Sequence, residues 1–279
     1  RSLGEKFSAA DFYELIREKS NSGSGDTTLE GKRAEFDKLS IHEKFDPLDI
    51  KIAHQRIALM AFHPAVENRV IFAGDTVGDL GIWAIDDELT SSEPNITIVK
   101  PHGKLVSKIT VPTHLPNQVF SASYDGSVRK LDLNKLDSQE VAYIRDPYSE
   151  KDVPLGVSDI SFCGLSSPNL LYMTTLSGNF YQHDIRTKFK FKDLDLLRLH
   201  DKKIGSFSVN PNTPHLIATA SLDRSLRVWD LRNISQKNGS WLEYDSQTSP
   251  FLVGTYESRL SVSCVDWNSD NQLVCNGYD

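Results

Sequence analysis

Six basic side chains stand just before short apolar segments that recur along the chain. They are Arg56, Lys104, Lys108, Lys202, Lys203 and Arg259. If those segments are equivalent strands of a repeated unit, the six cations lie on one face, around the mouth of a channel, and suit the phosphates of a nucleic acid. The net charge of the chain is −7, which gives nucleic-acid binding no support. Ordinary solvated charge therefore explains the same residues equally well.

The tetrapeptide Trp229-Asp230-Leu231-Arg232 offers a second kind of chemistry. An arginine placed after a strand can form a bidentate hydrogen bond that a lysine cannot form. His183-Asp184-Ile185-Arg186 is a poorer copy of the same pattern. The alternative is that Arg232 only caps a strand end at the surface.

Catalytic and metal-binding patterns are missing from the sequence. The histidines are scattered, and neither Gly-x-Ser-x-Gly nor His-Glu-x-x-His occurs. The three cysteines, Cys163, Cys264 and Cys275, are odd in number and have no Cys-x-x-Cys spacing. They favour a reducing compartment and buried thiols. We therefore expect a protein that is not an enzyme and that has no metal and no cofactor.

Five in-phase copies of one segment indicate the elements that must position these residues. Residues 217–232 read IATASLDRSLRVWDLR, in which two β-rich runs flank a turn at residues 222–224. The positions that match Asp223 in the other copies are Val77, Asp125, Ser177 and Asp279, at steps of 48, 52, 46 and 56 residues. WD repeats have a period of about 40–45 residues plus loop insertions. The spacing predicts an all-β fold, a WD-repeat β-propeller in which each copy is a hairpin of one blade.

Within such a blade we expect four polar groups to bond together and hold the hairpin. A histidine before the blade, a hydroxyl at the end of one strand, the turn aspartate and the tryptophan of the next strand correspond to His200, Ser221, Asp223 and Trp229. The role is structural, because buried polar groups need partners. The first copy keeps His54 and Trp83 but has Val77 at the turn, and the second keeps Ser123 and Asp125 but has Leu131 in place of tryptophan.

Composition and the chain ends set the domain boundaries. With 279 residues, 39% hydrophobic and 25% charged, the chain belongs with soluble globular proteins, and it has neither a membrane-spanning run nor a signal peptide. Residues 1–45 form an N-terminal segment, in which a helix from Ser8 precedes a Ser/Gly-rich linker. Residues 46–279 hold the propeller, and its last copy stops in the turn at Asp279. Because an incomplete set of blades cannot close a ring, we expect a fragment of a protein that has seven blades in full.

Four segments carry a resemblance to a known family. They are HPAVENRVIFAGDTVGDLGIW, DKKIGSFSVNP, IATASLDRSLRVWDLRN and YESRLSVS. The chain resembles the WD-repeat DNA damage-binding family, relatives of the small subunit of the UV-damaged-DNA-binding complex, and most of all its fungal nuclear branch. The likeness begins at about Asp46. It implies a nuclear, non-enzymatic protein of the DNA damage or replication-stress response, in which one propeller face binds damaged duplex DNA. Arg56, Lys202 and Lys203 match the family's backbone-gripping residues best, whereas Lys104, Lys108 and Arg259 depend on the register of the repeats.

The resemblance also implies a second class of function. Trp229, Asp230 and Arg232 match the Trp-Asp-x-Arg box with which substrate receptors of cullin-RING ubiquitin ligases dock on their adaptor. The alternative function is therefore a protein-interaction scaffold or a ligase receptor. The partners implied are DNA, as damaged duplex or as a single strand, together with the ligase adaptor or chromatin proteins, and no membrane.

Overall fold

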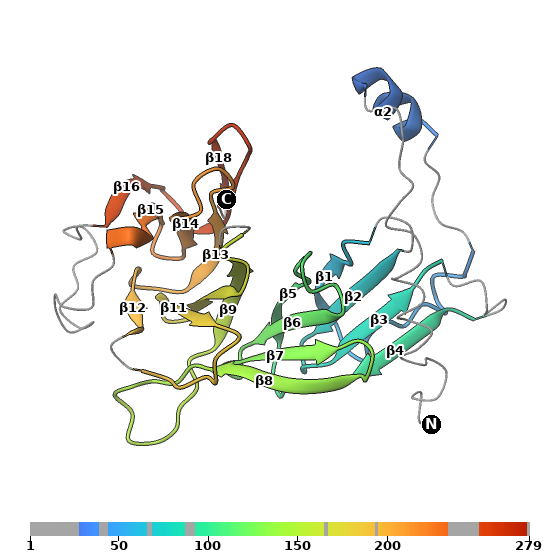
Figure 1. Ribbon diagram of the computed structural model, residues 1–279, viewed down its shortest axis with the longest axis horizontal. Coiled ribbons are helices and arrows are strands. Elements are labelled where there is room, and N and C mark those ends of the chain that lie inside the picture. Colours follow the sequence, from blue (N-terminus) through green and yellow to red (C-terminus); the bar gives the residue numbers. More distant parts are fainter. Residues whose placement is uncertain are drawn as a thin grey trace.

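The computed structural model describes residues 28–38, 44–65, 69–86, 93–164, 167–192, 195–233 and 251–277. These residues form a short helix, α2 (Leu29–Phe36), and a series of antiparallel sheets that follow one another along the chain (Figure 1). The helix expected from Ser8, the linker after it and the turn at Asp279 lie outside the described residues.

Four sheets have four strands each, and we number them as blades in chain order. Blade 1 contains β1 (Ile57–Phe62), β2 (Val70–Asp75), β3 (Leu80–Ala84) and β4 (Asn95–Val99). Blade 2 contains β5 (Val106–Thr110), β6 (Gln118–Ser123), β7 (Ser127–Asp132) and β8 (Asp137–Tyr143). Blade 3 contains β9 (Val157–Phe162), β10 (Leu170–Thr175), β11 (Asn179–Asp184) and β12 (Leu197–Arg198). Blade 4 contains β13 (Ile204–Val209), β14 (Leu216–Ser221), β15 (Ser225–Asp230) and β16 (Leu252–Glu257).

A fifth sheet, blade 5, has two strands among the described residues, β17 (Val262–Trp267) and β18 (Leu273–Gly277). The first strands of successive blades contact one another in chain order, β1 with β5, β5 with β9, β9 with β13 and β13 with β17. They are the inner strands of a propeller, and the prediction of an all-β fold built from four-stranded blades is confirmed.

The repeated segment is the hairpin formed by the second and third strands of each blade. The residue after the position that matches Asp223 has a positive φ in the first four copies: 98° at Gly78, 86° at Gly126, 83° at Gly178 and 73° at Arg224. Glycine adopts this conformation without the steric cost that a Cβ atom brings. Arg224 shows that the turn geometry persists where glycine is absent.

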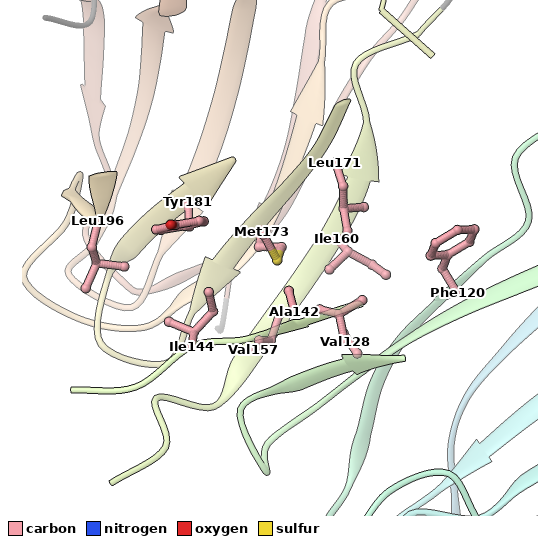
Figure 2. Packing of buried hydrophobic residues seen from close by; sticks show 11 residues of the cluster. Phe120, Val128, Ala142, Ile144, Val157, Ile160, Leu171, Met173, Tyr181 and Leu196 are labelled. Carbon is pink, nitrogen blue, oxygen red and sulfur yellow. The ribbon is translucent and has the colours of Figure 1, made fainter. Parts of the chain in front are cut away.

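Apolar side chains between neighbouring blades form the core. Between blades 2 and 3, Phe120, Val128 and Ile144 face Ile160, Leu171 and Met173, all of which are almost completely buried (Figure 2). Each sheet therefore buries its faces against the next sheet, and stability depends on contacts between neighbours in the chain.

The cysteines differ from the prediction of buried thiols. Cys163 is buried, but Cys264 and Cys275 are exposed. Both exposed residues belong to blade 5, which packs on blade 4 through one face and whose other face no sheet covers among the described residues. Within the same residues, no helix has the length and apolar character needed to span a membrane.

Candidate nucleic-acid interface

The loops that lead into the inner strands all lie beside the hairpin turns. In each of blades 1 to 4, the amide at the start of the turn donates to a carbonyl of the preceding loop at 2.9–3.1 Å: Thr76 to Arg56, Tyr124 to Leu105, Leu176 to Gly156, and Leu222 to Lys203. These loops and turns therefore occupy one face, which we call the entrance face. It is the face on which the sequence places the basic residues.

Five of the six predicted basic residues lie in these loops, but at three different positions of the repeat. Arg56 and Lys203 occupy equivalent positions, because the carbonyl of each accepts the hydrogen bond from the first amide of the hairpin turn in its own blade. Lys104 and Lys202 stand one residue earlier, and each carbonyl accepts a bond from a serine hydroxyl of the blade. Arg259 lies three residues before β17, and the loop into blade 3 has Leu155 and Gly156 instead of cations. The basic residues thus form a discontinuous group and not an even ring.

Lys108 is the exception, and its expected place in an entrance loop is wrong. It lies inside β5, paired with Ala122, and its Nζ is 3.1 Å from Oδ1 of Asp159 on β9. The Asp159 side chain is only 3% exposed and also accepts the amide hydrogens of Phe207 and Ile160. Burial raises the pKa of Asp159, and the nearby Lys108 ammonium opposes that rise. Lys108 therefore belongs to a polar link that joins the inner strands of blades 2, 3 and 4.

Lys203 reaches from blade 4 to blade 2. Its Nζ donates to the Tyr124 hydroxyl at 2.8 Å and lies 5.3 Å from the centroid of the Tyr124 ring. This partner is a phenol and not a carboxylate, so the contact is a hydrogen bond with a cation–π component and not an ion pair. Arg56, Lys104, Lys202 and Arg259 are exposed.

A chain of buried hydrogen bonds supports the loop that carries Lys202 and Lys203. Trp229 Nε1 donates to Thr219 Oγ1 at 2.8 Å, Thr219 Oγ1 lies 2.7 Å from His200 Nε2, and His200 Nδ1 lies 2.8 Å from Asp223 Oδ2. The sequence assigned the bridging hydroxyl to Ser221, and this assignment is wrong. Ser221 instead accepts the Asp223 amide hydrogen and donates to the Lys202 carbonyl. The register of the β14–β15 pair explains the difference. Ile217 pairs with Trp229, so Thr219 is the diagonal neighbour of Trp229, whereas Ser221 stands two residues further along β14.

Burial and hydrogen bonding together set the protonation states of His200 and Asp223 in this chain of bonds. Burial lowers the pKa of His200, although Asp223 opposes the shift. Burial raises the pKa of Asp223, but hydrogen bonds from His200 and Ser225 outweigh that effect and hold the pKa below its ordinary value. A neutral imidazole with its proton on Nδ1, beside an ionised carboxylate, satisfies both partners.

The other blades repeat parts of this arrangement. In blade 2, His102 bonds Ser121 at 2.8 Å and Ser127 at 2.9 Å, with Asp125 3.4 Å away. The sequence interpretation missed this histidine, although it stands four residues before β5 as His200 does before β13. In blade 1, His54 bonds Asp79 at 2.8 Å, but the His54 side chain is 57% exposed and only Asp79 is buried, so this histidine is not part of a buried chain of bonds.

Arg232 lies at the opposite end of the blade. Its Nε and Nη2 donate to the two carboxylate oxygens of Asp230 at 3.0 and 2.7 Å, and its side chain is 64% exposed. The Arg232 guanidinium lowers the pKa of Asp230 to about 2. Arg186 holds Asp184 in the same way, at 2.9 and 2.6 Å. Two neighbouring blades thus present one surface arginine each, already paired with a carboxylate of its own blade.

Two contacts of the inner strands and entrance loops could not be found from local patterns. Asp159 and Tyr124 contact Lys108 and Lys203 across blades, at sequence separations of 51 and 79 residues.

Within the described ranges, no three His, Cys, Asp or Glu side chains gather as metal ligands would.

Comparisons with known proteins agree with this architecture. Residues 191–230 match the WD domain, G-beta repeat family. Proteins named DNA damage-binding protein CMR1 match the whole chain: 61% identity in Debaryomyces hansenii, 60% in Scheffersomyces stipitis and 54% in Candida albicans. The matches cover 48%, 54% and 48% of these relatives, so the chain spans about half of their length. The chain is therefore a WD40-repeat protein, homologous over its whole length to part of the fungal proteins named DNA damage-binding protein CMR1.

Proposed function

We propose that the entrance face binds DNA through its backbone phosphates, and that the protein acts in the nucleus on damaged DNA. The observation that carries the proposal is the group of cations on this face, among them the exposed Lys202 and the half-buried Lys203 on one loop. Bonds of Thr219, Ser221 and Asp223 fix this loop. The name that the fungal relatives share, DNA damage-binding protein CMR1, supports DNA as the ligand. The proposal assigns no catalytic step to the chain.

The geometry favours recognition of backbone shape over base sequence. Ammonium and guanidinium groups on loops can reach phosphates, and such contacts position a protein on DNA without reading bases. Distorted duplexes, such as UV-damaged DNA, differ from intact DNA in backbone path and deformability. Preference for a lesion would then come from how easily a damaged duplex deforms to the path that binding requires, and not from the individual phosphate contacts.

Replacement of Lys202 and Lys203 by glutamate tests the proposal. Each phosphate contact releases condensed counterion, so Lys202→Glu with Lys203→Glu should lower the slope of log affinity against log salt by up to about 1.8, at roughly 0.9 per contact. The affinity for intact and for damaged duplexes should fall by the same factor, because phosphate contacts carry no information on the bases. Fluorescence anisotropy of a labelled duplex over a salt series measures both effects.

A matched pair of lysines away from the entrance face provides the control. Lys188→Glu with Lys190→Glu makes the same change of charge at exposed positions between β11 and β12. DNA affinity should stay within about twofold of the unmodified protein, because screening weakens exposed charges beyond about 10 Å. Equal losses from the two pairs would indicate diffuse attraction, and an unchanged slope in the Lys202, Lys203 variant would contradict the proposal.

We propose docking on a ubiquitin-ligase adaptor as a second candidate function, because Arg232 is exposed and held in place by its bidentate bond to Asp230. Arg232→Ala should abolish co-purification with the adaptor and leave DNA affinity unchanged, since Arg232 and the entrance face are at opposite ends of the strands. Arg186→Ala, which removes the equivalent arginine of blade 3, is the control. Adaptor binding that survives Arg232→Ala would leave this residue as a surface cap of its strand.

A further inference from the structure

A basic segment lies on blade 3, away from the entrance loops. Residues 188–192 read KFKFK, and exposure alternates along them: Lys188, Lys190 and Lys192 are exposed, whereas Phe189 and Phe191 are half-buried. Alternation with a period of two indicates an extended chain. The segment therefore presents three ammonium groups on one side and two phenyl rings on the other.

Aromatic packing anchors this segment. The Phe189 ring lies edge-on to His183 at a centroid distance of 5.0 Å, and the Phe191 ring stacks on Tyr181 at 5.5 Å. The Arg145 guanidinium lies 5.8 Å from the centroid of the Phe191 ring. The amide of Lys192 donates to the Tyr181 hydroxyl at 3.1 Å. The segment is thus fixed on the blade by its side chains.

The backbone of the segment is open, in contrast with the outer strands of the other blades. Strands β4, β8 and β16 have 5, 7 and 6 residues, whereas β12 has only 2 and pairs with Asn179 and Phe180 alone. Among the described residues, the backbone groups of residues 188–191 form no hydrogen bond. An extended chain with unpaired N–H and C=O groups is a template for another strand.

Two of the three lysines of the segment have no ion-pair partner among the described residues. Lys192 lies 3.9 Å from Asp195, and Arg186 nearby is bonded to Asp184. Lys188 and Lys190 have no carboxylate within ion-pair distance among the described residues. Alternate residues of an extended chain lie about 6.6–6.8 Å apart, so the two ammonium groups have the spacing of acidic side chains at alternate positions of an extended peptide.

We propose that the 188–192 segment binds an extended acidic peptide of a partner protein by strand addition. The backbone of the peptide would pair with residues 188–191, and its alternate Asp or Glu side chains would meet Lys188 and Lys190. A peptide fits better than a nucleic acid, because only a peptide backbone completes the open ladder and because packing on Tyr181 and His183 occupies the phenyl rings that bases would need for stacking. This surface is separate from the entrance face and does not depend on DNA binding there.

Fluorescence anisotropy with a labelled ten-residue peptide of alternating Glu and Thr tests the proposal. The peptide should bind saturably, and Lys188→Glu with Lys190→Glu should weaken binding by about tenfold or more, the sum of two exposed charge contacts and the repulsion that replaces them. Methylation of alternate backbone nitrogens of the peptide should also weaken binding, because it removes donors of the ladder. Lys202→Glu with Lys203→Glu should leave peptide affinity unchanged.

Three outcomes would overturn the proposal. One is equal binding of a peptide with five Thr followed by five Glu, which would show that charge alone attracts the peptide. A second is unchanged binding in both the Lys188, Lys190 glutamate variant and the milder Lys188→Gln, Lys190→Gln variant, each checked by circular dichroism for an intact fold. The third is a loss of duplex DNA affinity in these variants as large as that of the Lys202, Lys203 variant, which would make the segment a contact for phosphates.

Discussion

Trp229→Ala should lower the free energy of unfolding by about 3–5 kcal/mol, the usual cost of emptying a buried aromatic site. Trp229 is fully buried, its ring packs on Phe251 at 5.6 Å, and its Nε1 donates to Thr219. The substitution removes packing between blades 3 and 4 together with the first bond of the chain that leads to Asp223. Urea unfolding followed by circular dichroism measures the change.

Two hydroxyl variants separate ring packing from hydrogen bonding in this site. Thr219→Val keeps the volume but leaves Trp229 Nε1 and His200 Nε2 without their partner, at a cost of roughly 1–3 kcal/mol for each unsatisfied group. Ser221→Ala should cost less, because its hydroxyl bonds two backbone groups of a partly exposed turn at 3.1 and 3.3 Å. An equal or larger cost for Ser221→Ala would return the bridging role to Ser221.

Lys108→Met should destabilise the protein by about 2–3 kcal/mol at pH 7 and by much less at pH 4. The cost at pH 7 arises because Asp159 would remain buried and ionised without its cation. It stays below that of a fully buried pair, because the Lys108 side chain is 42% exposed. Burial already raises the pKa of Asp159, so its contribution to stability is present at low pH and is lost as the pH rises through the pKa of the folded protein. Removal of Lys108 raises the pKa of Asp159 further, so more stability is lost by pH 7.

The double variant Lys108→Met with Asp159→Asn is the control. It removes both charges and should recover most of the stability at pH 7, although the amide cannot accept both backbone bonds as the carboxylate does. Urea unfolding of the three proteins at pH 4, 5.5 and 7 gives the comparison. A cost for Lys108→Met that is independent of pH would mean that the lysine acts through packing and not through its charge.

Local sequence determined the hairpins of this protein. The period-two alternation of residues 217–221, the turn at residues 222–224 and the in-phase copies predicted the second and third strands of each blade. The predicted bonding of His200 to the turn residue Asp223 corresponds to a contact in the structure, because the distance of the histidine from its blade is fixed along the chain. Such features depend on neighbours within one blade, and local spacing encodes them.

Only the tertiary structure decided which side chains meet across blades. It placed Lys108 beside Asp159 and Lys203 beside Tyr124, and it put Thr219 instead of Ser221 between Trp229 and His200. A shift of one position in register changes the face on which a strand residue lies, and a shift of two changes which residue it meets on the neighbouring strand. A contact between blades depends on the packing of two sheets and not on either sequence alone. The repeats and their turns could therefore be predicted from the sequence, whereas the partners of the charged residues depend on how the blades pack.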